Sequence, residues 1–177
     1  MQAILVDVDN NKATFMLSKA IGYEEMNHET DDSGKSSGGF GASAMKGWLD
    51  NVYNNKLDAD LKAVISSTPV PCAGGPDAPR TTTNVNCHLF LPSVIEMNQH
   101  ELLFMWGYYP YEAEIRSEGS TFDFFANGGE IEDDEGIWMR TPSCVTGEGY
   151  FFNSLYGGND PGCAYENLAV CPAFVIG

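Results

Sequence analysis

Arg140 stands shortly after an acidic run and is one of three arginines in a chain with a formal net charge of -16. Residues 130–135 read EIEDDE, and residues 136–142 read GIWMRTP. A guanidinium here could bind an anion, act as a catalytic cation, or pair with a nearby carboxylate and clamp the structure. In a strand, Trp138 and Arg140 would share a face, so that the guanidinium could stack on the indole, and Pro142 would end the strand.

The acidic run also carries the ligand type that calcium prefers. Calcium takes six to eight oxygens from carboxylates and carbonyls, and the glycine-flanked residues 128–136 could supply several of them. The DxDxDG spacing of an EF-hand is absent, and a solvated acidic loop explains the same residues without a metal. We therefore assign no metal ligand.

None of the common catalytic motifs is present in the sequence. It has no GxSxG, no HExxH, no P-loop and no GxGxxG after a predicted strand. His28, His88 and His100 are scattered, and a lone histidine is more often a hydrogen-bonded surface residue than a ligand. Cys87 and His88 are adjacent, so in a strand they would point to opposite sides rather than form a thiolate–imidazole pair. We expect a protein that is not an enzyme, with no catalytic residue and no cofactor.

Residues 150–167 have a composition typical of adaptable binding surfaces. Tyrosine gives contact area at a low entropy cost, and asparagine and serine give flexible hydrogen bonds. Aromatic faces beside Asn and Asp also suit sugars. An ordinary strand and turn is the competing interpretation, in which alternate residues belong to the core. The predicted ligand-binding residues are Tyr150, Phe152, Asn153, Ser154, Tyr156, Asn159, Asp160, Tyr165 and Asn167.

Short strands and two main helices would position these residues. Residues 3–17 alternate in hydrophobicity around turn residues at 9–12, which predicts a β-hairpin. A helix is expected from Ser43, its natural N-cap, because the apolar residues from Met45 to Tyr53 recur at helical spacing. A second, shorter helix is expected over residues 58–66.

The rest of the chain predicts loops and short strands. The polar residues 24–42 predict a long loop, and residues 67–86 predict a loop with at most one short strand. Residues 89–91 predict a strand, and Ser93 and Glu96 form a capping-box pattern that predicts a brief helix. Further strands are expected over 137–140, 150–155 and 168–176, with turn chemistry at 157–162.

Length and charge limit the class of protein. A chain of 177 residues fits one domain, residues 1–177, without a linker to a second. With 25 acidic against nine basic residues, its surface would repel nucleic-acid phosphates and anionic lipid. We expect no nucleic-acid partner and no membrane insertion, and the N-terminal MQAILVDVDNN is not a signal peptide.

Five cysteines without CxxC spacing favour reduced thiols, while disulfides among Cys144, Cys163 and Cys171 stay open.

Four short motifs follow one another along nearly the whole chain. They are Ser43-Ala44-Met45-Lys46-Gly47-Trp48-Leu49-Asp50, then Thr82-Thr83 with Leu89-Phe90-Leu91-Pro92-Ser93, then Trp138-Met139-Arg140-Thr141-Pro142, and last Leu168 to Ile176 with Pro172-Ala173-Phe174. In this order they resemble an uncharacterised domain family of bacterial and phage proteins, with motifs like SxLRxWLN, TTxxxxFLPS, WLRSP and GVxPAF. The chain departs mildly from that pattern at Met139, Thr141 and Cys171.

That family is similar to a variant of the C-type-lectin fold, which also serves sulfatase-modifying-factor-like enzymes and the variable proteins of diversity-generating retroelements. The resemblance implies an α+β, C-type-lectin-like fold with short antiparallel strands, two main helices and long irregular loops. It implies no chemistry, because fold does not fix function. The motif series favours a structural clamp for Arg140. It also implies structural roles for Trp48, Trp138, Pro142, Pro172 and Phe174.

The expected function is non-enzymatic recognition or a structural role in a virion, for example in a phage tail or a cell-surface adhesin. The partner would be a host-surface protein or glycan bound by the C-terminal strands and loops, or other virion proteins, and a homo-oligomer fits either case. The location would be a phage particle or the cell surface. The alternatives are a pure capsid or tail assembly or decoration protein and an enzyme of the modifying-factor type. Residues 143–168 could also form a diversified region.

Overall fold

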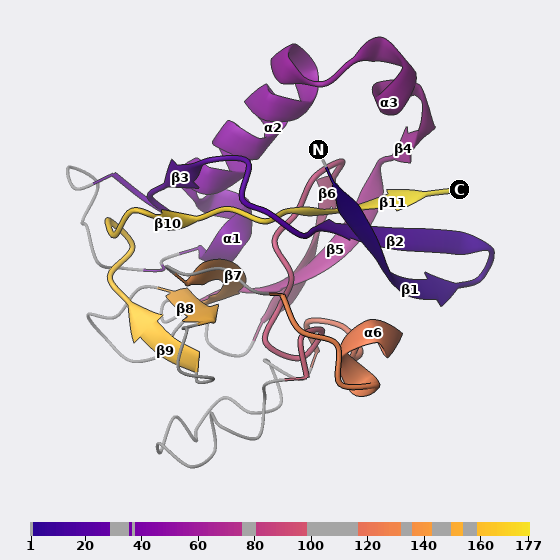
Figure 1. Cartoon of the computed structure of the whole chain (residues 1–177). Helices are drawn as coiled ribbons and strands as arrows, with labels where there is room; N and C mark the ends of the chain where they lie inside the picture. The colour runs from indigo at the N-terminus through magenta and orange to yellow at the C-terminus, as the bar shows by residue number, and fades with distance from the viewer. Residues whose placement is uncertain are drawn as a thin grey trace.

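The structure, a computed structural model, describes residues 2–28, 36, 38–75, 81–98, 117–131, 136–142, 150–153 and 159–177, and only the backbone of 150–153 and 159–162. These residues form four helices and eleven strands (Figure 1), so the predicted α+β class is confirmed at that level. The helices are α1 (Gly39–Ala42), α2 (Ala44–Lys56), α3 (Ala59–Val64) and α6 (Asp123–Ala126). The strands are β1 (Ala3–Asp9), β2 (Lys12–Leu17), β3 (Tyr23–Glu24), β4 (Ile65–Ser66), β5 (Thr68–Ala73), β6 (Thr82–Cys87), β7 (Ile137–Pro142), β8 (Tyr150–Asn153), β9 (Asn159–Gly162), β10 (Leu168–Ala169) and β11 (Ala173–Ile176).

The first and last strands share an antiparallel sheet with the order β1-β2-β11-β4. The predicted hairpin is confirmed, since β1 and β2 pair along their length. Asn10 and Asn11 both have positive φ, 48° and 63°, as a tight two-residue hairpin turn requires. β11 pairs with β2 on one side and with β4 on the other, so the C-terminal strand is held inside the sheet.

A five-stranded sheet with the order β3-β10-β7-β8-β9 carries most of the C-terminal third. Its central strand β7 is parallel to β10 and antiparallel to β8. β8 and β9 form an antiparallel hairpin that ends the sheet. Figure 1 shows this hairpin at one end of the molecule, away from the β1–β2 hairpin.

The prediction of a loop over residues 67–86 is wrong for much of that segment, because β5 and β6 pair antiparallel from Thr68 to Ala73. β5 contains Pro69 and Pro71. Alternate residues of a strand direct their N–H groups to the same side, so two prolines at this spacing are compatible with a strand that is paired on one side only.

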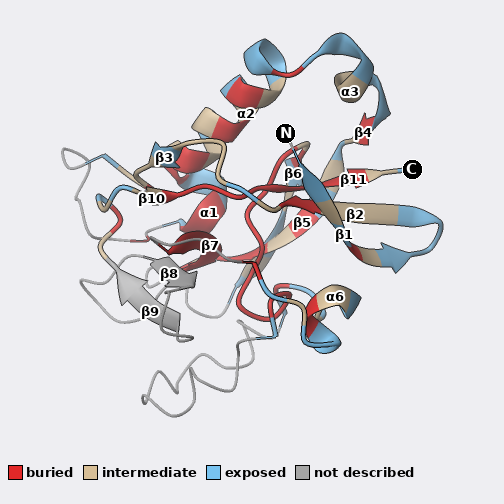
Figure 2. Cartoon of the chain, viewed as in Figure 1, coloured by how far each residue is buried: buried red, intermediate tan, exposed pale blue. Residues whose placement is uncertain are grey.

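The helix predicted from Ser43 is confirmed as α2. Ser43 Oγ accepts a hydrogen bond from the N–H of Lys46 at 3.2 Å. Met45, Leu49 and Val52 are buried against the core, and Figure 2 shows buried bands along α2 between intermediate and exposed ones. The second helix is shorter than predicted, because α3 ends at Val64 and the next two residues pair with β11 as β4.

Two further expectations are met only in part. The strand predicted over residues 89–91 is a single bridge between Phe90 and Ala173. The segment predicted as a long loop contains β3 at its start and α1 at its end. Within the described ranges, none of the helices has the length and apolar character that crossing a bilayer would need.

Candidate functional site

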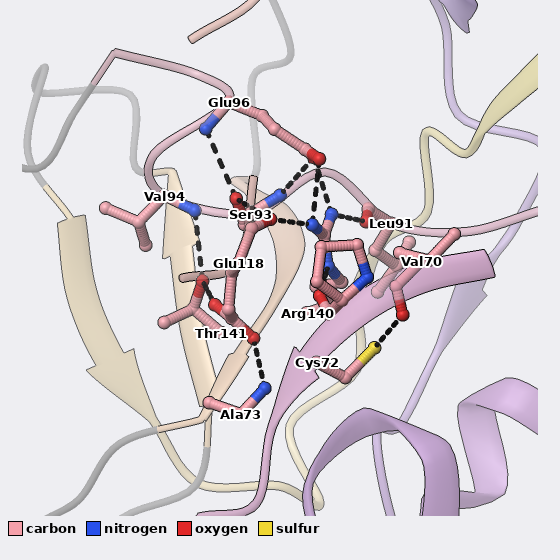
Figure 3. A network of polar contacts seen from close by, with 11 residues as sticks. Val70, Cys72, Ala73, Leu91, Ser93, Val94, Glu96, Glu118, Arg140 and Thr141 are labelled. Carbon is pink, nitrogen blue, oxygen red and sulfur yellow. Dashed lines mark hydrogen bonds and ion pairs between the residues drawn. The ribbon is translucent and has the colours of Figure 1, made fainter. Parts of the chain in front are cut away.

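The candidate site is a buried polar network around Arg140 on β7 (Figure 3). β7 lies in the middle of its sheet, and all six of its residues are buried. The exposed fraction of Arg140 is 0%. A charge removed from water is costly unless it is paired and hydrogen-bonded, so the contacts of this guanidinium decide what it can do.

Five hydrogen bonds match the five N–H groups of the Arg140 guanidinium. Nε donates to the carbonyl oxygen of Pro71 at 3.0 Å, and Nη1 donates to that of Leu91 at 2.9 Å. Nη1 and Nη2 donate to the two carboxylate oxygens of Glu96, at 2.5 and 2.8 Å. Nη2 also donates to the carbonyl oxygen of Glu118. Because arginine has five such donors and no acceptor, none is left over for a ligand.

Glu96 is held in place by the capping box that the sequence predicts. Its Oε2 accepts from the N–H of Ser93 at 2.9 Å, and its own N–H donates to Ser93 Oγ at 3.2 Å. Residues 94–98 nevertheless form turns rather than the predicted helix. Gly119 lies against the carboxylate with a φ of 131°, and a Cβ there would be 2.8 Å from Glu96 Oε1. A side chain at position 119 would therefore displace the ion pair.

Glu118 adds a second buried carboxylate to the network. Its Oε1 accepts from the N–H of Ala73 on β5 at 2.8 Å, and its Oε2 accepts from the hydroxyl of Thr141 on β7 at 2.6 Å. The same hydroxyl accepts from the N–H of Val94 at 3.0 Å. The side chain of Glu118 thus links β5 to β7, and Thr141 extends the link to the segment after Pro92.

Burial and neighbouring charges shift the pKa values of Glu118 and Arg140 in opposite directions. Burial raises the pKa of the Glu118 carboxyl above its usual value, against the charge of Arg140 and the hydrogen bonds from Ala73 and Thr141. Burial alone would lower the pKa of Arg140, but the charge and hydrogen bonds of Glu96 outweigh that effect and raise it. The guanidinium therefore stays charged, while Glu118 is the group whose protonation folding favours.

Of the three roles considered for Arg140, the geometry supports that of a structural clamp. An anion site or a catalytic cation needs an N–H that is open to a ligand, and these are occupied. The expected partners differ in detail. The bidentate acid is Glu96 rather than a residue of the acidic run, and the aromatic ring near the guanidinium is that of Phe90, at 5.9 Å. Trp138 instead donates its indole N–H to the carbonyl oxygen of Glu24 at 2.9 Å.

The other residues with predicted structural roles lie in or beside the core. Trp48 is partly buried on α2, with Lys56 Nζ 5.4 Å from the centre of its ring. The carbonyl oxygen of Pro172 accepts from the N–H of Leu17 at 3.0 Å. The ring of Phe174 stacks on that of Phe15 at 5.7 Å. Pro142 is buried and is the last residue of β7.

The predicted ligand-binding residues fall into three groups. The backbones of Tyr150, Phe152, Asn153, Asn159 and Asp160 lie in the β8–β9 hairpin, which places position 152 opposite 160 and position 153 opposite 159. Tyr165 is 43% exposed, and Asn167 is exposed in the segment before β10. Ser154 and Tyr156 lie outside the described residues.

The described histidines and cysteines have ordinary surroundings. His28 Nδ1 lies 3.3 Å from Glu25 Oε2, and His88 stacks on Tyr53 with ring centres 3.9 Å apart. The cysteines at 72, 87, 163 and 171 are not in disulfide bonds, whereas Cys144 and His100 lie outside the described residues. No group of three His, Cys, Asp or Glu side chains suited to a metal occurs in the part of the chain that the structure describes. Residues 132–135 of the acidic loop considered for calcium are not in that part.

Sequence reasoning did not identify Glu96 and Glu118 as partners of Arg140. The capping-box spacing of Glu96 from Ser93 was a signal in the sequence, but it predicted the start of a helix and not a distant cation as the partner. Glu118 carried none, because Arg-Ser-Glu-Gly-Ser over residues 116–120 is indistinguishable from an exposed polar loop.

Comparison with known proteins identifies a family without an assigned activity. The model of a domain of unknown function, DUF6273, matches residues 11–177. The searches of curated proteins and of solved structures found no match. The resemblance to an uncharacterised domain family is confirmed at that level. Because the match covers nearly the whole chain, the protein belongs to the DUF6273 family.

Proposed function

We propose that this chain is a non-enzymatic recognition domain that binds a protein or a glycan through the β8–β9 hairpin and residues 163–167. The main support for this proposal is the position of the hairpin in the sheet. It ends the five-stranded sheet, and it is bonded to β7, which Arg140 ties to the core. A binding edge on a fixed strand is pre-organised, which lowers the ordering cost of association.

The residues of this edge support the same proposal. Backbone pairing puts aromatic and polar positions side by side, Phe152 with Asp160 and Asn153 with Asn159. Tyr165 and Asn167 are exposed next to them in sequence. Such a mixture suits protein surfaces and sugars. In this proposal the fold is a C-type-lectin variant, and the domain belongs to a phage tail or a cell-surface adhesin.

The test is binding of the purified chain to a glycan array and to a bacterial cell-envelope preparation. Tyr165→Ala combined with Asn167→Ala is expected to weaken binding by about tenfold or more, as removal of central contacts does. Val64→Ala is the matched control, because Val64 is 47% exposed on α3, far from β8 and β9 in Figure 1. Circular dichroism would check that both proteins are folded.

Two other results would replace the proposal. A symmetric oligomer that the edge variant dissociates, with no glycan or envelope ligand, would indicate an assembly protein. Turnover of a small molecule by the wild-type chain, lost with Cys163→Ser or Cys171→Ser, would indicate an enzyme of the modifying-factor type.

A further inference from the structure

A cavity of about 480 Å³ lies between α2 and the segment that joins β2 to β3. This segment passes close to the helix, since a Cβ on Gly22 would be 3.3 Å from the indole of Trp48. The volume is within the usual range of small-molecule sites, about 300–1,000 Å³. The cavity is lined by Gln2, Lys19, Ala20, Ile21, Val52, Lys56 and Leu57.

Two of the nine basic residues of the chain, Lys19 and Lys56, line this cavity. Both are exposed, and neither forms an ion pair with a carboxylate among the described residues. Lys46, on the same helix as Lys56, shows the contrast, because its ammonium lies 2.6 Å from Asp50 Oδ2. In a chain with 25 acidic residues, two such lysines beside one cavity give it a local charge opposite to that of the whole surface.

The floor of the cavity is apolar and continues towards the core. Ile21, Val52 and Leu57 also line a second, smaller cavity, whose remaining walls are apolar as well. Those walls are Leu17, Leu61, Ile65, Leu89, Pro172 and Phe174. That second cavity is only about 10 Å³, so a ligand in the larger cavity would rest on the three shared side chains and would not pass between them.

We propose that this cavity binds a single-chain amphipathic anion, specifically a medium-chain fatty acid. The carboxylate would lie between Lys19 and Lys56 at the opening, and the alkyl chain would pack on Ile21, Val52 and Leu57. Two lysines over an apolar floor fit this class because its members join one anionic end to one unbranched hydrocarbon chain. The proposal is independent of the recognition function, since none of the residues that line the cavity belongs to β8, β9 or residues 163–167.

Titration calorimetry of the whole chain with decanoate is the direct test. Binding is expected at concentrations below about 1 mM, an affinity that a small apolar contact area allows. Affinity should fall about threefold to fourfold for each methylene removed, as burial of CH₂ groups predicts. Lys19→Gln combined with Lys56→Gln should weaken decanoate by about threefold to tenfold, the range of two exposed ion pairs. Ala20→Phe should block the cavity and abolish binding.

The controls separate this site from non-specific association. Lys12→Gln removes one positive charge at the tip of the β1–β2 hairpin and should leave decanoate binding unchanged. Decyl phosphate should bind less tightly than decanoate if the site is made for a carboxylate, and tighter binding of the phosphate would assign the site to phosphate-headed lipids instead. Equal affinity for decanol and decanoate, or equal losses with Lys12→Gln and with the lysine pair, would overturn the proposal.

Discussion

Arg140 and Glu96 form a bidentate ion pair in the interior, with Nη1–Oε2 at 2.5 Å and Nη2–Oε1 at 2.8 Å, although they are 44 residues apart in the chain. The exposed fractions of their side chains are 0% and 7%. Such a pair is weak evidence for net stability, because both ions lose their hydration. Its geometric consequence is clearer, since planar two-point pairing fixes the orientation of β7 relative to the segment around Glu96.

Loss of one partner should be far more harmful than loss of both. Arg140→Ala would leave two carboxylates buried near an empty space, and breaking a buried pair in this way costs about 3–5 kcal/mol. We expect a loss of that size in the free energy of unfolding, measured with urea. Replacement of both partners by Arg140→Met and Glu96→Leu should recover part of it.

Lys46→Met is the control for that experiment. It removes the Lys46–Asp50 pair on α2, where the Asp50 side chain is 44% exposed, and should cost about 0.5 kcal/mol or less. If Arg140→Ala kept its stability and instead lost binding to a glycan or envelope ligand, Arg140 would belong to the recognition surface and its assignment as a structural clamp would be wrong.

Thr141→Val tests the hydroxyl that connects Glu118 to the N–H of Val94. The valine has the same shape but can neither accept from Val94 nor donate to Glu118, which leaves buried polar groups unsatisfied. We expect a loss of about 2–3 kcal/mol in the free energy of unfolding. Thr141→Ser keeps the hydroxyl and loses one methyl group, so it should cost only about 1 kcal/mol. A larger loss with Thr141→Ser than with Thr141→Val would show that packing, not the hydrogen bonds, is what matters at this position.

Glu118→Gln tests the pH dependence that burial gives this carboxyl. Because its pKa is raised in the folded state, its contribution to stability is fully present below the ordinary value of 4.5 and is lost as the pH rises through the folded pKa. Wild type should therefore lose stability relative to Glu118→Gln as the pH is increased from about 4 towards 8. Urea unfolding of both proteins at several pH values gives the difference curve. A difference that grew in favour of wild type with rising pH would mean that the charge of Arg140 outweighs burial at Glu118.

Local signals in the sequence predict the parts of the fold that local forces determine. The β1–β2 hairpin depends on Asn10 and Asn11, which tolerate positive φ, and α2 depends on the Ser43 cap and its apolar face. The end of α3 depends on a distant partner instead. Ile65 has helical spacing with Leu61, yet it pairs with Ile176 of β11, and no local pattern reports that pairing.

The candidate site also has parts that local sequence signals predict and parts that they do not. The motif around Arg140 marks a constrained strand, and the spacing of Ser93 and Glu96 marks a capping box. Their meeting requires that β7, β5 and the segment after Phe90 converge, which is a property of the tertiary fold. The acidic run offered Arg140 nearer carboxylates in sequence. In a central strand, however, a side chain reaches what packs on the sheet rather than what precedes it in the chain.

Thiol reactivity offers a test of burial that does not depend on a ligand. Burial raises the pKa of Cys72 to about 12 and that of Cys87 to about 11. Because only the thiolate reacts, iodoacetamide at about pH 8 should leave both unmodified in the native protein. Cys171 is fully buried and should also be protected, whereas Cys163 is half-buried and should react before the other three described cysteines. Peptide mapping by mass spectrometry follows each cysteine separately, and labelling in guanidinium chloride provides the unfolded reference. Rapid labelling of Cys72 in the native state would mean that the β5 side of the Arg140 network opens readily to solvent.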